Sequence, residues 1–111
     1  MIMNDLTQKH CIPCEGGQKP LDATFIAELK EQLKKEWEVI ENKKIKQQFL
    51  FKTFKEAINF VNKVAELAET EDHHPNVFIS YNKVTITLST HAIGGLSEND
   101  FILAAKIEQL Q

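Results

Sequence analysis

The heptapeptide Glu69-Thr70-Glu71-Asp72-His73-His74-Pro75 constrains the fold of this chain more than any other stretch. It follows a long helical pattern, and Pro75 disfavours helical geometry at His74, so the helix must end here and continue as extended chain. Two of the four histidines lie in this stretch, and a third, His91, lies just past the predicted hairpin that follows. Imidazoles and carboxylates therefore gather where a helix ends and a sheet begins.

The size and charge of the chain fit a single globular domain. With 111 residues, 42% of them hydrophobic, it can bury a core without disulfides or metals. The formal net charge of -3 disfavours a nucleic-acid surface. No apolar run approaches the ~20 residues needed to span a membrane, and the first five residues lack a signal-peptide pattern. We therefore expect a cytoplasmic protein with no nucleic-acid or membrane partner.

Residues 1–20 show no periodicity and are predicted to form an irregular arm ahead of one domain at 21–111. Cys11-Ile12-Pro13-Cys14 in this arm has C-x-x-C spacing and follows His10. A structural zinc site normally needs four ligands, and a redox pair needs a helix N-terminus beside its first cysteine. We expect a plain arm, with metal or redox chemistry as the alternative.

The hydrophobic periodicity predicts the element order α-β-β-α-β-β-α. Three helices are expected at 22–34, 53–69 and from 97 onward, each preceded or opened by a capping residue: Asp22, Thr53 and Ser97. Strands are expected at 37–40, 45–51, 77–81 and 84–89. Because these strands pair as hairpins, we predict an α+β fold whose four-stranded antiparallel sheet carries its helices on one face.

The longest predicted helix has an unusually broad apolar face. One stripe is widened by a second set of apolar residues, and together they comprise Phe54, Ala57, Ile58, Phe60, Val61, Val64, Ala65, Leu67 and Ala68. Such a face suggests burial against the sheet and against a second contact, such as another subunit.

The second hairpin predicts which histidines meet. A two-residue turn at Asn82-Lys83 would place Ile79 opposite Ile86 and, when extended, His74 opposite His91. Three imidazoles near neighbouring carboxylates suit acid and base chemistry near neutral pH. Zinc binding is an alternative, although no H-x-x-x-H spacing is present.

At this level of detail the chain resembles the pterin-4a-carbinolamine dehydratases. The resemblance rests on the pattern Glu69-x3-His73-His74-Pro75-x5-Tyr81-x9-His91-x8-Asp100, and on Leu88-Ser89-Thr90-His91 and Gly94-Gly95-Leu96-Ser97-Glu98. The Cys11-x-Pro13-Cys14-Glu15-Gly16-Gly17 segment also resembles the arm of bacterial members. Many members carry an aromatic residue where this chain has Val77, so packing beside the pterin is expected to differ.

The resemblance implies a hydro-lyase that converts 4a-hydroxytetrahydropterin, the 4a-carbinolamine, to quinonoid dihydropterin and water. This reaction recycles tetrahydrobiopterin after aromatic amino acid hydroxylation and needs no metal or organic cofactor. Elimination requires an acid for the departing hydroxyl and a base for the N5 proton.

The family motif also implies roles for individual residues. His73 and His91 carry over as acid and base, in an order that the sequence leaves open, and His74 holds the pterin. Glu69, four residues before His73, is expected to orient that ring. Pro75, Tyr81 and Asp100 carry over as supporting residues, although Asp100 could simply complete a helix cap with Ser97.

The same resemblance bears on partners. It implies a homodimer or homotetramer and a possible link to an aromatic amino acid hydroxylase. Animal members also serve as dimerisation partners of a transcription factor, so the alternative function is a protein-binding module acting as a transcriptional cofactor.

Overall fold

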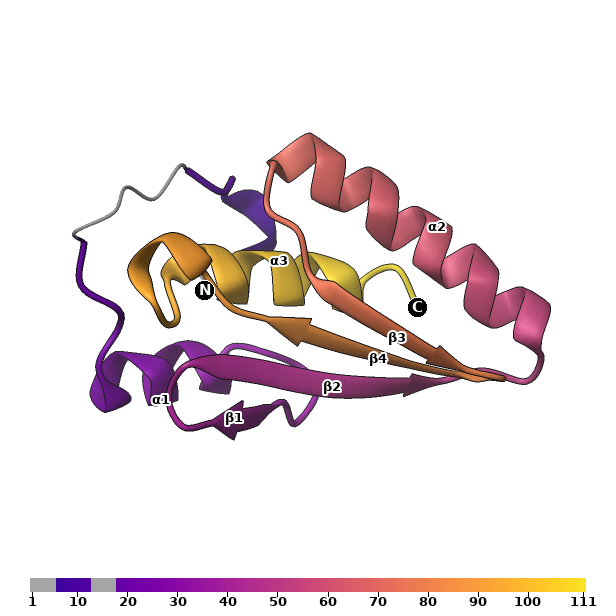
Figure 1. The fold of residues 1–111 in the computed structure, drawn as a ribbon, viewed down its shortest axis with the longest axis horizontal. Helices are drawn as coiled ribbons and strands as arrows, with labels where there is room; N and C mark the ends of the chain where they lie inside the picture. The colour runs from indigo at the N-terminus through magenta and orange to yellow at the C-terminus, as the bar shows by residue number, and fades with distance from the viewer. Residues whose placement is uncertain (1–5, 13–17) are drawn as a thin grey trace.

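The computed structural model describes residues 6–12 and 18–111 and confirms the predicted α+β fold (Figure 1). Two short 3-10 helices accompany the three helices and four strands. In chain order the elements are η1 (Leu6–Gln8), α1 (Ala23–Glu31), β1 (Glu38–Ile40), β2 (Lys44–Leu50), α2 (Phe54–Glu71), β3 (Asn76–Ser80), β4 (Lys83–Leu88), η2 (His91–Ile93) and α3 (Glu98–Glu108).

The four strands form one antiparallel sheet in the order β1-β2-β4-β3. After β2 the chain leaves the sheet, runs back along it as α2, and re-enters at β3, which is an edge strand (Figure 1). The C-terminal end of α2 is thereby brought beside the chain that follows β4. This route places the predicted histidine segment near His91.

One face of the sheet is buried and the other is open to solvent. In β4 the side chains of Val84, Ile86 and Leu88 are fully buried, and their neighbours on the other face are threonines. On that other face Phe78 and Leu50 are exposed. The alternation predicted from the β-branched residues is therefore confirmed, and the buried face shares one hydrophobic core with α2 and α3.

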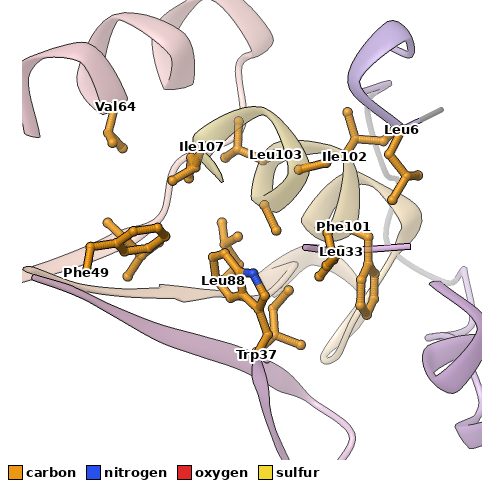
Figure 2. Packing of buried hydrophobic residues seen from close by; sticks show 14 of the residues in the cluster. Leu6, Leu33, Trp37, Phe49, Val64, Leu88, Phe101, Ile102, Leu103 and Ile107 are labelled. Carbon is orange, nitrogen blue, oxygen red and sulfur yellow. The ribbon is translucent and has the colours of Figure 1, made fainter. Parts of the chain in front are cut away.

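Helix α3 lies at the centre of the core. Residues 101–105 and Ile107 are all buried, and α3 contacts η1, α1 and α2. Figure 2 shows Phe49 and Leu88 of the sheet meeting Leu103 and Ile107 of α3 in this cluster. The helix with the weakest amphipathic pattern is thus the most enclosed, because several elements pack around it.

Helix starts follow their predicted caps more closely than helix ends do. Asp22 accepts a hydrogen bond from the Phe25 N–H at 3.0 Å, and Thr53 accepts one from the Glu56 N–H at 3.1 Å. Helix α1 ends at Glu31, short of the predicted residue 34. Helix α2 runs on to Glu71, beyond the predicted residue 69.

The core-facing side of α2 differs from the predicted stripe. Ala57, Phe60, Val64 and Ala68 are buried, whereas Phe54 and Ala65 are exposed. Ala57 and Ala68 belong to the predicted stripe, whereas Phe60 and Val64 belong to the set that was expected only to widen it. Of the remaining apolar positions, Val61 and Leu67 pack against the core while partly buried, and Phe54 stays open for another contact.

The predicted register of the second hairpin is wrong. Val77 pairs with Ile86 and Ser80 with Lys83, so the turn consists of Tyr81 and Asn82, with Tyr81 at φ +55°. Asn82 is held at the end of β2: its Nδ2 donates to the Phe51 carbonyl at 2.7 Å, and its own carbonyl accepts the Phe51 N–H at 2.9 Å. This tertiary contact selects the turn.

The expected N-terminal arm is only partly described. Within residues 1–20 the structure describes η1, whose Leu6 is buried in the core, and the division into an arm and a domain stays a prediction.

In the described part of the chain no helix has both the length and the apolar character to cross a membrane. The cytoplasmic location also stays a prediction.

Candidate active site

A cavity of about 400 Å³ opens where the end of α2, the η2 turn and the start of α3 meet. All three predicted histidines line it, although His74 does not lie opposite His91 as the register predicted. The lining residues are Ile12, Asp72, His73, His74, Ser89, Thr90, His91, Ala92 and Asn99.

His73 is oriented by a buried carboxylate. Its Nε2 lies 2.7 Å from Oδ1 of Asp100, which is fully buried. The other oxygen, Oδ2, accepts the Thr90 hydroxyl at 2.8 Å and the Ser97 N–H at 3.0 Å. The helix cap considered for Asp100 therefore exists, and the same carboxylate also holds His73.

This contact leaves Nδ1 as the ring nitrogen of His73 that is not bound to Asp100. A carboxylate has no hydrogen to donate, so in its pair with Asp100 the His73 ring donates its Nε2–H. In the neutral ring Nδ1 then carries the lone pair. A proton taken up by Nδ1 produces an imidazolium that the carboxylate stabilises.

Glu69 contacts His74, and the predicted contact with His73 is wrong. The Glu69 Oε2 lies 2.6 Å from Nε2 of His74, and both side chains are exposed. The expected spacing of four residues assumed a continuing helix, but Asp72 adopts the left-handed conformation at φ +54° and ends it. This turn directs His73 toward Asp100.

His91 lines the cavity from the loop that follows β4. It begins η2, and its side chain is exposed. A bridge between Thr90 and Gly95 closes this loop, with the Thr90 N–H donating to the Gly95 carbonyl at 2.8 Å. Because the Thr90 hydroxyl also donates to Asp100, one residue ties the His91 loop to the His73 pair.

None of the four predicted supporting residues lines this cavity: Asp100 and Glu69 each contact a histidine that does, and Pro75 and Tyr81 lie elsewhere. Pro75 lines a separate hollow between α2 and β3, together with Val77. Tyr81 is exposed at the hairpin turn.

Sequence reasoning missed several groups that complete the site. Thr90 and Ser97 were part of the family pattern, but nothing in their spacing indicated a hydrogen-bond network with Asp100. Ile12 and Asn99 also line the cavity. The sequence offered no signal that the arm reaches this point.

The described residues give no support to a metal or redox role for the arm. Within residues 6–12 and 18–111, no group of three or more His, Cys, Asp and Glu side chains is placed to hold a metal ion. Burial, aided by the negative charge of Glu71, raises the pKa of the Cys11 thiol to about 12. That thiol stays protonated at neutral pH, which disfavours thiolate chemistry. Cys14 lies outside the described residues.

Comparison with known proteins defines the class to which this fold and site belong. The family model described as "Pterin 4 alpha carbinolamine dehydratase" matches residues 19–110. A relative from Alkaliphilus metalliredigens, named "Putative pterin-4-alpha-carbinolamine dehydratase", is 48% identical over 98% of both chains. A relative of the same name from Rickettsia canadensis is 48% identical over 96% of this chain and 97% of its own. The chain belongs to the pterin-4a-carbinolamine dehydratase family.

Solved structures agree at the level of fold. The crystal structure of a transcriptional coactivator/pterin dehydratase from Brucella melitensis has a TM-score of 0.77 and 33% identity. The match covers 84% of this chain and 98% of the Brucella melitensis chain. A pterin dehydratase-like RuBisCO assembly factor, with a TM-score of 0.56 and 23% identity, shares the fold.

Proposed function

We propose that this protein is a 4a-hydroxytetrahydropterin dehydratase, a hydro-lyase that serves pterin recycling. The curated relatives, 43–48% identical across nearly the whole chain, support this activity. The observation that carries the proposal at the site is the His73–Asp100 pair on the wall of a cavity that His74 and His91 also line.

The groups in the cavity suit the elimination of water from a carbinolamine. The C4a–O bond breaks as the hydroxyl leaves with an added proton, the N5–H proton is removed, and a C4a=N5 double bond forms. One base and one acid therefore suffice. Nδ1 of His73, supported by Asp100, is suited to accept the N5 proton, and His91 is suited to protonate the hydroxyl.

His74 and Glu69 have a different role in this proposal. His74 lines the cavity, and the Glu69 carboxylate that contacts it at 2.6 Å is exposed, as is the His74 ring. We assign His74 to holding the pterin. We also expect the substrate to come from an aromatic amino acid hydroxylase, since such enzymes produce the carbinolamine.

The proposal is tested by the turnover of a 4a-carbinolamine generated in the assay, with the unaided reaction subtracted. His73→Ala and His91→Ala should each lower kcat by ~10²-fold or more, as expected for loss of an acid or base. Circular dichroism and urea unfolding verify that each variant folds. Full turnover by both folded variants would refute these roles.

We also propose that the protein assembles with copies of itself at the outer edge of β3. This strand has no neighbour on one side within the described chain, and Phe78 on it is 67% exposed. Val77 adds apolar surface to the hollow between α2 and β3. A bare apolar edge strand favours pairing with another strand. The surface fits self-association, and both a dimer and a tetramer stay open.

A further inference from the structure

We infer that Ile12 of the N-terminal arm is a substrate-binding residue, and that Asn99 and Glu71 are positioning residues that hold it over the cavity. This inference rests on the proposed function, because it assigns a contact to the pterin ring. It goes beyond the histidine chemistry, since none of these three residues belongs to the motif that identified the site.

Asn99 binds both main-chain groups of Ile12. Its Oδ1 accepts the Ile12 N–H at 3.0 Å, and its Nδ2 donates to the Ile12 carbonyl at 2.6 Å. Asn99 is itself buried on the first turn of α3. The Asn99 amide thus pairs with both the N–H and the C=O of Ile12, as a neighbouring β-strand would. This pairing fixes the backbone at Ile12.

Glu71 holds the backbone of Cys11, the residue before Ile12. The Glu71 side chain is only 3% exposed, and its Oε1 accepts the Cys11 N–H at 2.8 Å. Oε2 lies 2.6 Å from Nζ of Lys106 and 3.2 Å from Nδ1 of His10. A buried carboxylate with these partners is costly to leave unpaired, so the arm is firmly attached at this point.

The residues that hold the arm lie on the same elements as the His73–Asp100 pair. Asn99 directly precedes Asp100 on α3, and Glu71 lies two residues before His73 at the end of α2. The position of Ile12 relative to His73 is therefore set over short stretches of rigid backbone. Such attachment to helix ends is what a substrate contact requires.

Ile12 supplies the kind of surface that the cavity otherwise lacks. Its side chain is 70% exposed, so it contributes little to the core. Apart from Ala92, the other cavity-lining residues have polar side chains. A flat heterocyclic ring binds best when polar groups fix its edge and an apolar group covers its face. Ile12 is placed to cover the ring while the histidines address its edge.

The test compares Ile12→Ala with Phe25→Ala, a matched loss of an exposed apolar side chain on α1, away from this cavity. Binding of biopterin is followed by its fluorescence, and kcat and KM are measured with the carbinolamine. Ile12→Ala should raise both the biopterin Kd and KM by ~10-fold, as expected for lost apolar contact. Its kcat should stay within ~2-fold of wild type, and Phe25→Ala should change neither constant.

Two further variants separate a specific contact from general damage. Ile12→Leu should restore most of the affinity, since it retains the apolar surface. Asn99→Ala should weaken binding in the same direction, and combining it with Ile12→Ala should add little, because both act through one contact.

The outcomes for this inference and for the proposed function can be told apart. Unchanged biopterin Kd and KM in Ile12→Ala overturn the inference while leaving dehydratase activity intact. A wild-type protein that binds biopterin without turnover overturns the proposed function, and the Kd comparison then still decides the role of Ile12. A wild-type protein that binds no pterin overturns both.

Discussion

At the scale of single residues, two carboxylate–histidine contacts of almost equal length have very different surroundings. The Asp100–His73 contact, at 2.7 Å, involves a fully buried carboxylate, whereas the Glu69–His74 contact, at 2.6 Å, is exposed. Solvent weakens interactions at the exposed pair, and its side chains can separate at little cost. The buried pair has no alternative partner in water, so it determines the ring orientation.

This difference predicts the outcome of matched substitutions. Asp100→Asn keeps an oxygen that can accept the hydrogen bond but removes the charge that favours imidazolium, so kcat should fall by ~10–100-fold with little change in KM. Glu69→Gln should change kcat by less than ~3-fold. Steady-state kinetics of the two folded variants check this. Equal losses of kcat in both would show that burial does not distinguish the pairs.

At the scale of elements, the end of α2 joins the arm to α3 through one buried ion pair. Burial acts to raise the pKa of Glu71, but hydrogen bonds from Lys106, the Cys11 N–H and His10 outweigh it and lower the pKa to about 2. Glu71 is therefore charged at any pH near neutrality. Three segments that lie far apart in sequence, the arm, α2 and α3, depend on this charge.

Acid should weaken the fold through this group. Because the folded-state pKa of Glu71 lies below its ordinary value of 4.5, its stabilisation is fully present above pH 4.5 and is lost as pH falls toward 2. The loss should reach roughly 3 kcal/mol on full protonation near pH 2, and roughly 2 kcal/mol by pH 3. Urea unfolding between pH 7 and pH 3 measures this in wild type and in Glu71→Gln.

The two proteins should differ in a defined way. Glu71→Gln should be less stable at pH 7, because Lys106 is left buried without its partner, and should show a smaller decline with acid. Glu36→Gln serves as the control, since Glu36 is 93% exposed beside Lys30 and should have almost no effect. A Glu71→Gln protein with the wild-type pH dependence of stability would contradict this role of the Glu71 charge.

At the scale of the whole molecule, the sheet has one buried face, one open face and an apolar edge at β3. Phe78 and Gln48 lie on the open face, each paired with Thr85 of the central strand β4. Phe78 belongs to the edge strand β3, whereas Gln48 belongs to the inner strand β2, whose pairing with β1 is confined to Lys44–Lys46. Substitutions at these two positions therefore test whether self-association uses the β3 edge or the open face of the sheet.

Phe78→Lys should weaken self-association, because a charged edge resists strand pairing. Gln48→Lys adds the same charge on the same face and should leave association unchanged. Sedimentation over a range of protein concentrations gives the assembly state of each. If both variants assemble as wild type does, the interface lies elsewhere, and the exposed side of α2 becomes the next surface to alter.

The sequence by itself determined the features that depend on residues close together in the chain, such as helix boundaries and strand faces. Asp22 and Thr53 open their helices, Pro75 keeps the chain that follows α2 out of helical geometry, and the β-branched alternation of residues 84–88 identifies a half-buried strand. These effects act within a few residues, so pattern and capping chemistry suffice to predict them. All three histidines line one cavity, although the hairpin register from which their meeting was predicted is wrong.

Only the tertiary structure decided the contacts that join distant parts of the chain. The turn of the second hairpin depends on Asn82 meeting Phe51, and the partner of His73 depends on the left-handed turn at Asp72 and on where α3 begins. Ile12 reaches the cavity because Asn99, 87 residues away, binds its backbone. Such contacts arise from packing of whole elements, which local residue patterns do not encode.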